Sequence, residues 1–589
     1  MNMNLRIKFQ KPGQAGIALL LTMIMCGVAL AILAAAMAWS ASSTRLTYRS
    51  IQYIRSEAAA EAATDKVVSQ MTRDFLYGGE SMVNNNLNTY RQSTAPTTAD
   101  SAYWSNWQFD DGNGDVGQTY VQPGTSDKYV ALNPPYAGLN GYVSTYTVVS
   151  HAKDTASVQD VTAGVLQQVQ LDTIPIFQFA MYSSGDMEVS CGQHFDVTGP
   201  VHSNGHLYVE PDSSLTFESD VTAVLDVLLQ RDPLDTRGPL GGGVEYVETN
   251  APSFPVAALT LPIGSSNSPE AVREIIEPPP SGEDPNSPLG KLRYYNECDM
   301  IVTVSDSGVS ATSGVEINNR ATSITNTELA NFVSITNNFY DGRESKMVEP
   351  IDINIGNLTA WSATNNSLRP ILGGLNLSSI YILDTRTPLT LPSTSLGAVR
   401  VVNGLQLPPN GLTVATARPL YVLGNYNQTN SAYLGTNNTS TTEPASLVAD
   451  AITILSEGWH DVNQQSANEN FASPTTVNAA FLTGAVETTQ GQYSGGMENF
   501  PRFLESWGPT IFTYNGSMVK MFPSLYATNV WEGINYANHY YDPPARNWTF
   551  DANFDDPKKL PPKTPSLLKV VRTQWANAVP GQNVASAVP

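Results

Sequence analysis

One loop of this 589-residue sequence places oxygen-bearing side chains at alternate positions: Asp111, Asn113 and Asp115. A hard cation such as Ca²⁺ takes about six to eight oxygen ligands, so this loop is a calcium candidate. An EF-hand loop would continue with Gly and end in Glu, where this chain has Val116 and Gln122. A Gly-rich turn between strands is therefore the alternative interpretation, and we assign no metal to the chain.

Three histidines, His194, His202 and His206, follow one another within 13 residues. Imidazole nitrogens suit Zn²⁺ or Cu²⁺, and a β-framework could bring the three rings together. Neither a Cys-x-x-Cys nor a His-Glu-x-x-His pattern accompanies them. Three histidines in separate turns is the simpler interpretation.

Two runs combine carboxylates with arginine: Asp341 with Arg343 and Glu344, and Asp384 with Arg386. Facing each other across a groove, such groups could serve a polysaccharide-cleaving enzyme. Each run is more simply a turn or a surface ion pair. The sequence also holds no Gly-x-Ser-x-Gly motif and no phosphate-cradling loop. We therefore predict no catalytic residue, no cofactor and no enzymatic activity.

The chain has three cysteines. Cys26 lies in an apolar run near the N-terminus, whereas Cys191 and Cys298 form an even pair in the part that we expect to be exported. In an oxidising compartment these two could form a disulfide. Two unrelated buried thiols is the alternative, because pairing cannot be deduced from sequence.

Composition restricts the class of partner. Asp and Glu outnumber Lys and Arg by 53 to 31, for a net charge of −22. Nucleic-acid binding needs clustered cations, so we predict no nucleic-acid partner. Charged residues make up only 14% of the chain, below the usual quarter, and Ser, Thr, Asn and Gly take their place. This composition is typical of a β-rich protein outside the cytoplasm.

The elements that must position these residues begin with an uncharged apolar run from Ile17 to Trp39. As a helix it spans roughly 34 Å, enough to cross a bilayer. Arg6, Lys8 and Lys11 precede it, which places the basic end in the cytoplasm and the bulk of the chain outside. The run is longer than the apolar core of a cleaved secretory signal, about 7–15 residues.

The helix continues beyond the apolar run. Residues 40–77 contain neither Pro nor Gly, and Ile51, Ile54, Ala58 and Ala62 recur at helical spacing. Gly78 and Gly79 are expected to end the helix. We predict one helix of roughly 60 residues, whose first part lies in lipid and whose second, amphipathic part packs on a globular head.

Two stretches of this helix resemble a known family: Gly16–Leu21 and Tyr53–Ala63 are similar to the N-terminal domain of PilX-type minor pilins, a resemblance that covers about residues 11–75. It implies a leader cut between Gly16 and Ile17 by a prepilin peptidase. It also implies an inner-membrane helix whose partners are other pilins.

Leu21 stands where most members of that family carry a Glu that registers subunits in the fibre. A rare or tip-located subunit is therefore favoured over a repeating fibre subunit. An uncleaved, membrane-tethered surface adhesin is the alternative, and a β-solenoid enzyme that acts on polysaccharides is a third.

The remainder of the chain is predicted to be mainly β. Short strand-like runs separated by Asn and Gly turns favour a parallel β-solenoid, with a β-sandwich as the alternative. The whole is similar to a minor-pilin domain joined to a large β-rich surface domain. The predicted parts are a basic leader (1–16), a transmembrane segment (17–39), an amphipathic helix (40–79), a β-sheet region packing on that helix (80–173), a solenoid-like body (174–540) with an insertion (224–292), and a Pro-rich C-terminal tail (541–589).

Overall fold

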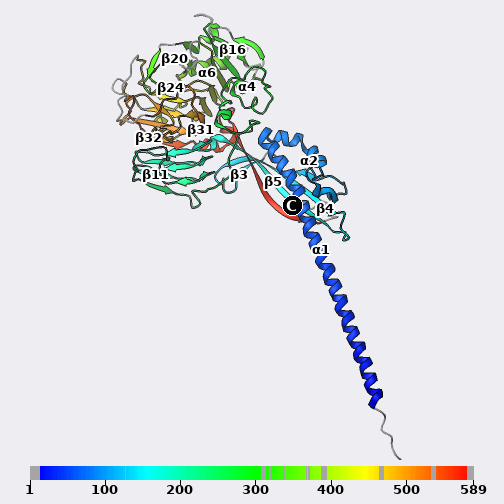
Figure 1. The fold of residues 1–589 in the computed structure, drawn as a ribbon. Coiled ribbons are helices and arrows are strands. Elements are labelled where there is room, and N and C mark those ends of the chain that lie inside the picture. The colour runs from blue at the N-terminus through cyan, green and yellow to red at the C-terminus, as the bar shows by residue number, and fades with distance from the viewer. Residues whose placement is uncertain are drawn as a thin grey trace, which may run out of the picture.

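The computed structural model describes residues 14–126, 128–306, 313–317, 320–324, 326–335, 338–365, 368, 372–386, 394–462, 470–531 and 539–579. Most of the predicted basic leader (1–16) and the end of the predicted tail (541–589) lie outside these residues. The described chain has one long N-terminal helix followed by a β-rich region (Figure 1).

Helix α1 runs from Gln14 to Asn85. The predicted stop at Gly78 and Gly79 is a kink and not an end: Gly79 has φ 69°, a conformation that side chains with a Cβ rarely adopt, and the helix then resumes. The short helix α2 (Leu87–Ser93) follows. Figure 1 shows the N-terminal part of α1 projecting away from the rest of the molecule.

An antiparallel sheet lies against the second part of α1. Its strand order is β1-β4-β5-β33, with β2 and β3 also paired to β4, and we call these six strands the small sheet. Its last strand comes from the predicted C-terminal tail. The strands are β1 (Trp107–Asp110), β2 (Tyr120–Pro123), β3 (Lys128–Ala131), β4 (Asn140–Asp154), β5 (Thr162–Pro175) and β33 (Ser566–Ala578).

The contact between α1 and the small sheet is apolar. Ala60, Ala63, Val67, Met71 and Phe75 are fully buried, and their spacing of three and four residues places them on one face of the helix. They pack on side chains of β4 and β5. The second part of α1 therefore forms a hydrophobic core with the small sheet.

Residues 176–565, inserted between β5 and β33, form the body. Its first strands pair in parallel with a repeat of 20 residues: Met181 pairs with Val201, and Val201 with Val221. The strands are β6 (Met181–Ser183), β7 (Met187–Val189), β8 (Phe195–Val197), β9 (Val201–Ser203), β10 (Leu207–Val209), β11 (Ser214–Phe217), β12 (Val221–Ala223), β13 (Val227–Leu228) and β14 (Gly243–Tyr246).

Every third of these strands, β6, β9 and β12, joins an 11-stranded sheet, of order β12-β9-β6-β31-β28-β25-β23-β21-β15-β16-β17. Its pairs are parallel except at β16 and β17. The remaining strands of this sheet are β15 (Met300–Val304), β16 (Ser313–Ile317), β17 (Arg320–Ile324), β21 (Ser379–Asp384), β23 (Leu412–Thr416), β25 (Ala445–Ala449), β28 (Ala480–Ala485) and β31 (Met518–Pro523).

Four further sheets complete the described part of the body: a seven-stranded sheet, β18-β20-β22-β24-β26-β29 with β19 on β20, and three three-stranded sheets, β13-β10-β7, β14-β11-β8 and β27-β30-β32. The body is therefore β-rich, with several open sheets built mainly from parallel pairs. The remaining strands of these sheets are β18 (Val333–Ile335), β19 (Phe339–Asp341), β20 (Lys346–Asn354), β22 (Ser395–Val402), β24 (Leu420–Leu423), β26 (Ile452–Leu455), β27 (Thr475–Asn478), β29 (Arg502–Phe503), β30 (Ile511–Gly516) and β32 (Ala545–Phe550). The short helices are α3 (Pro269–Arg273), α4 (Tyr294–Glu297), α5 (Asn326–Leu329) and α6 (Ile355–Thr364).

Both faces of the 11-stranded sheet are buried. In β25, Leu447 faces the core between the sheets, whereas Val448 faces a second core on the opposite side. Residues 256–298 cover that opposite side with side chains such as Leu259, Val272 and Ile276. Burial on two faces explains why these strands are apolar almost throughout instead of alternating.

Candidate functional site

The most exposed apolar surface of the molecule is the N-terminal part of α1. Every residue from Ile17 to Ile51 is exposed, including Trp39 at 76%, and we call this stretch the projecting segment. Among the described residues, α1 is the one helix long and apolar enough to cross a membrane, judged by length and composition. Water is a poor solvent for such a surface, which instead suits lipid or other apolar helices.

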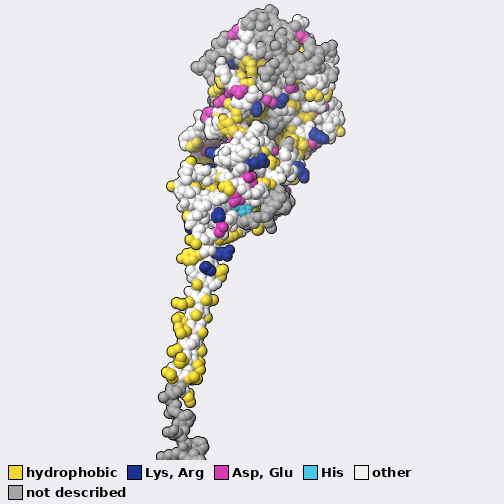
Figure 2. All heavy atoms as spheres, turned by 90° about the vertical axis from the view of Figure 1, so that its right-hand side faces the viewer, with side chains coloured by type: hydrophobic (Ala, Val, Ile, Leu, Met, Phe, Trp, Pro, Cys, Tyr) yellow, Lys and Arg dark blue, Asp and Glu magenta, His cyan; other side chains and the backbone are white. Residues whose placement is uncertain are grey.

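The projecting segment ends in cations. Figure 2 shows hydrophobic side chains along the visible face of the helix and then Lys and Arg side chains where it meets the rest of the molecule. Arg45 and Arg49 lie at the end of the projecting segment, and Arg55 approaches Asp154 of β4 at 3.9 Å. Gln52 also donates to Asp154, at 3.2 Å. Contacts with the small sheet therefore begin within one turn of the last exposed residue.

The candidate processing residues lie at the start of α1. Gly16 is helical, and Ile17, the expected first residue after a cut, is 67% exposed. Leu21, at the position where the resembled family carries Glu, is 61% exposed. The position is therefore apolar and open to a neighbouring helix or to lipid.

The calcium candidate forms a hydrogen-bonded turn. Asp111 Oδ1 accepts from the backbone N–H groups of Asn113 (2.8 Å) and Asp115 (3.0 Å), and Asp111 Oδ2 accepts from the Asn113 side chain at 3.1 Å. The loop's own donors thus occupy the Asp111 carboxylate. No group of three or more acidic, His or Cys side chains able to hold a metal occurs among the described residues.

Each of the three histidines has its own partners. His194 Nδ1 lies 2.6 Å from Ser214 Oγ, and His206 lies beside Asp226, at 3.7 Å. His202 is buried and bonds Thr222 at 2.8 Å, and burial lowers its pKa to about 4. Its other ring nitrogen, Nε2, lies 2.9 Å from Asn204 Oδ1, so both nitrogens of this buried histidine already have protein partners.

The predicted disulfide is not formed. Cys191 and Cys298 are both buried and are not joined by a disulfide, and they belong to the two different cores on opposite faces of the 11-stranded sheet. An even number of cysteines in the sequence does not predict whether two of them lie on the same face of a sheet. Cys26 is the one exposed thiol, on the projecting segment.

The carboxylate–arginine runs are buried and do not lie on the surface. Asp384 binds Arg386 through two hydrogen bonds of 2.9 and 2.8 Å, and both residues are almost fully buried. Asp341, whose pKa burial raises, accepts the Tyr421 hydroxyl at 2.6 Å. These groups have internal partners, so the ion pair of Asp384 is not a surface pair, whereas residues 342–345 form a turn, which is the other expected arrangement.

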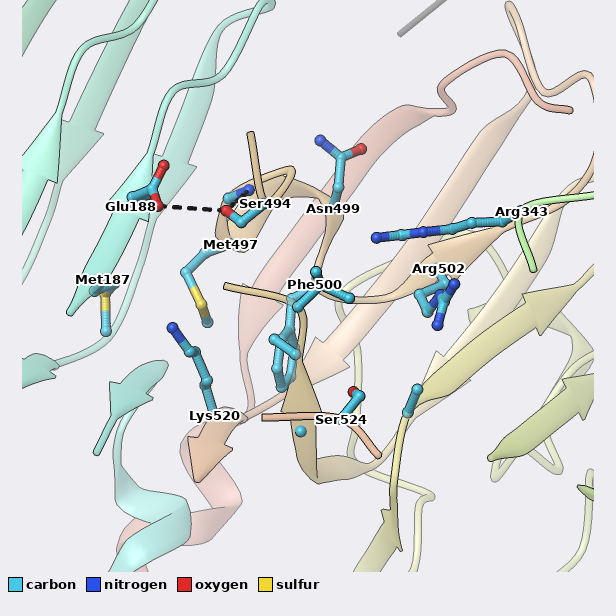
Figure 3. A pocket seen from close by; sticks show the side chains of 15 residues that line it. Met187, Glu188, Arg343, Ser494, Met497, Asn499, Phe500, Arg502, Lys520 and Ser524 are labelled. Atoms are coloured by element: carbon cyan, nitrogen blue, oxygen red, sulfur yellow. Dashed lines mark hydrogen bonds between the residues drawn. The ribbon is translucent and has the colours of Figure 1, made fainter. Parts of the chain in front are cut away.

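Two hollows of the body differ in size. Figure 3 shows the smaller, about 30 Å³, whose lining includes Glu188 and Lys520. Ser494 donates to Glu188 at 3.5 Å, and burial raises the pKa of this carboxyl to about 7. The volume admits about one water molecule, which excludes an organic ligand.

The larger hollow has a volume of about 380 Å³ and is lined by Tyr493, Trp531 and Tyr541, together with arginines and amides. We call it the aromatic cleft. Sequence reasoning missed it because its lining residues come from loops far apart in the chain. No local spacing connects Trp531 with Arg231 or Gln193.

Comparisons with known proteins are sparse. No protein-family model matches the chain, and no curated protein matches it. Among solved structures, the crystal structure of the competence-associated pilin ComZ from Thermus thermophilus is 8% identical and covers 90% of this chain and 97% of that chain, with a TM-score of 0.28. A likeness at this TM-score carries no argument about fold or function.

Proposed function

We propose that the chain is a membrane-anchored, pilin-like subunit of a type IV pilus or related secretion filament, of the PilX-type minor class. One observation carries the proposal: a single continuous helix has an exposed apolar first part and a second part packed on an antiparallel sheet. Such a division suits a helix that leaves the bilayer and packs among other pilin helices. The projecting segment would then mediate assembly.

In this proposal the anchor spans the bacterial inner membrane with its basic end inside. The small sheet and the body lie in the periplasm or on the cell surface. We further propose that the parallel pairs of the body, of which the first repeat every 20 residues, are coils of a parallel β-solenoid. A body of this size suits display at a filament tip and not repetition along a shaft.

The N-terminal mass of the mature chain tests the pilin assignment. Coexpression with a prepilin peptidase should give a chain that begins at Ile17, and Gly16→Leu should abolish the cut. Gly27→Leu is the matched control, because Gly27 lies in the same exposed helix with open space around it and should leave the cut unchanged. An intact N-terminus under these conditions would favour the uncleaved, membrane-tethered adhesin.

Thiol cross-linking tests assembly. Cys26 is exposed on the projecting segment, whereas the other two thiols are buried, and burial raises the pKa of Cys191 to about 12. Cys26 labelled in intact cells with a membrane-permeable benzophenone maleimide should therefore photo-cross-link to a partner helix, because the excited benzophenone inserts into C–H bonds and the partner needs no cysteine. Cys26→Ser removes the product if the proposal holds. Persistence of the product in Cys26→Ser, or its absence in the wild type, would contradict helix-mediated assembly.

A further inference from the structure

The aromatic cleft has the size of a small-molecule site. Its volume of about 380 Å³ falls in the range of roughly 300–1,000 Å³ typical of ligand pockets. All of its described lining residues belong to the body. Any role for it is therefore separate from membrane anchoring and from helix assembly.

Hydrogen bonds fix the rings of the cleft. The Trp531 indole N–H donates to the Tyr541 hydroxyl at 2.5 Å, and that hydroxyl donates to Asn499 at 3.0 Å. Tyr541 is buried, whereas Trp531 is only partly buried. Because its only polar atom already has a partner, Trp531 offers the cleft an apolar ring surface in a fixed orientation.

Two buried carboxylates hold the loop that leads to Trp531. Asp450 accepts from the backbone N–H groups of Leu525 (2.6 Å) and Ala527 (2.9 Å), and Glu344 accepts from Asn529 at 3.2 Å. Burying carboxylates is costly unless several donors satisfy them. The loop is therefore held in one conformation before any ligand arrives, which reduces the entropy lost on binding.

Two of the three arginines that line the cleft have carboxylate partners. Arg231 pairs with Glu210 (3.1 Å) and Asp235 (2.8 Å). Arg237 also pairs with Asp235, at 2.7 Å, and its guanidinium lies 3.7 Å from the centre of the Tyr493 ring. The third arginine, Arg546, shares the lining with the carboxyl groups of Asp212 and Glu498, so opposite charges offset one another and give the cleft little selectivity for an ionic ligand.

The rest of the cleft offers neutral or balanced hydrogen-bonding groups. Arg546 donates to the backbone carbonyl of Glu498 (3.1 Å) and to the Asn499 amide oxygen (3.3 Å). Gln193 and Asp212 are exposed lining residues. A ligand would meet donors and acceptors around an aromatic wall.

We propose that the aromatic cleft binds a neutral saccharide. A pyranose ring has an apolar C–H face that packs on an aromatic ring, and its hydroxyl groups both donate and accept hydrogen bonds. Trp531 would contact the apolar face, while Gln193 and Asp212 would contact hydroxyl groups. The proposal involves no bond breaking and goes beyond the proposed assembly role.

The test is glycan binding by the full chain in detergent micelles. An array of neutral and acidic glycans, followed by titration with maltotriose, cellotriose and chitotriose, should reveal binding of at least one neutral glycan. Trp531→Ala should weaken that binding at least tenfold, and Gln193→Ala several-fold. Trp575→Ala is the matched control, because Trp575 is a 48% exposed tryptophan on β33, and it should bind as the wild type does.

Three results would overturn the proposal: no neutral glycan bound at millimolar concentration, binding restricted to acidic glycans, or equal binding by wild type and Trp531→Ala. Gln193→Ala keeps the test decisive if Trp531→Ala fails to fold, because Gln193 is exposed. Failure here leaves the N-terminal cut and the Cys26 cross-link unaffected, so the two proposals fail independently.

Discussion

The small sheet and the body use ion pairs in opposite ways. Around the small sheet, two pairs have both side chains exposed: the Lys153 and Asp160 side chains are 36% and 78% exposed, and Arg572 and Asp65 are 53% and 42% exposed. In the body, histidine pairs such as His206–Asp226 are at least partly exposed, but four arginine–carboxylate pairs are buried. The arginine and carboxylate exposures there are 10% and 0% for Arg273–Asp450, 9% and 0% for Arg386–Asp384, 4% and 9% for Arg400–Asp352, and 6% and 1% for Arg502–Glu344.

The difference follows from what each region must hold in place. The small sheet has an apolar helix face to bury, so packing alone can hold it. The body contains long loops between short parallel strands, and buried carboxylates fix these loops by accepting their backbone N–H groups. The comparison predicts large effects for charge deletion in the body and small ones around the small sheet.

The largest effect is expected at Asp450. Its carboxylate binds Arg273 at 2.7 Å and backbone N–H groups of the loop that follows β31. Asp450→Ala leaves Glu277, at 2.9 Å, as the remaining carboxylate partner of the buried Arg273 and removes the acceptor of three backbone N–H groups, which together should cost about 3–5 kcal/mol. Denaturant unfolding of the full chain, followed by tryptophan fluorescence, measures the change. If Asp450→Ala lowers the free energy of unfolding by less than 1 kcal/mol, charge deletion has no larger effect in the body than around the small sheet, and the comparison is contradicted.

Where α1 contacts the small sheet, apolar packing should contribute more to the free energy of unfolding than ion pairs do. Met71 is fully buried in this contact, and Met71→Ala should cost about 2–5 kcal/mol through lost contacts and a residual cavity. The same denaturant series reports it. Met25→Ala is the control, because Met25 is 65% exposed on the projecting segment, and it should leave the midpoint unchanged.

The pH dependence of stability should come from buried carboxyls of the body. Burial raises the pKa of Glu505 to about 7, from an ordinary value of 4.5. The folded state therefore holds this proton more tightly than the unfolded state, and stability falls as pH rises from about 4.5 to about 7.

Removing the Glu505 carboxyl should make the free energy of unfolding less dependent on pH. We compare the free energy of unfolding of Glu505→Gln with that of the wild type at pH 5 and at pH 8. The difference should shift in favour of the variant by up to about 3 kcal/mol between pH 5 and pH 8. Denaturant midpoints at the two pH values measure it. The exposed Glu218→Gln serves as the control, and an unchanged pH profile in Glu505→Gln would show that burial of this carboxyl is not coupled to folding.

The smallest effect is expected for exposed pairs near the small sheet. Asp160→Ala removes a partner of Lys153 whose side chain is 78% exposed. Such pairs contribute about 0–1 kcal/mol, and added salt should reduce the difference further. A loss comparable to that of Asp450→Ala would contradict the contrast drawn above.

Local signals explain what could be predicted from sequence. The length of α1 and its division into exposed and buried parts follow from an apolar run, helix-forming residues and spacing within a few turns. The glycine pair at Gly78 and Gly79 predicts the end of a helix, whereas the structure has a kink there. A glycine pair has the same local sequence pattern at a helix end and at a kink. The β-rich character of the remainder was likewise visible in short strand-like runs.

Non-local pairing explains the rest. Strand β33 pairs with β5, so that Leu568 lies opposite Thr173, and no local pattern connects these segments. Arg502 pairs with Glu344, and the Trp531 indole donates a hydrogen bond to the Tyr541 hydroxyl, only after the body has folded. For the same reason the sequence could not decide between a Cys191–Cys298 disulfide and two unrelated buried thiols, of which the structure has the second, and could not predict the aromatic cleft.

The return of β33 to β5 sets an order of events during synthesis. The strand that completes the small sheet is synthesised after the whole body, so one edge of β5 stays open until then. An open strand edge is prone to aggregation. Chains interrupted before Ser566 would therefore carry an incomplete small sheet with an exposed strand edge.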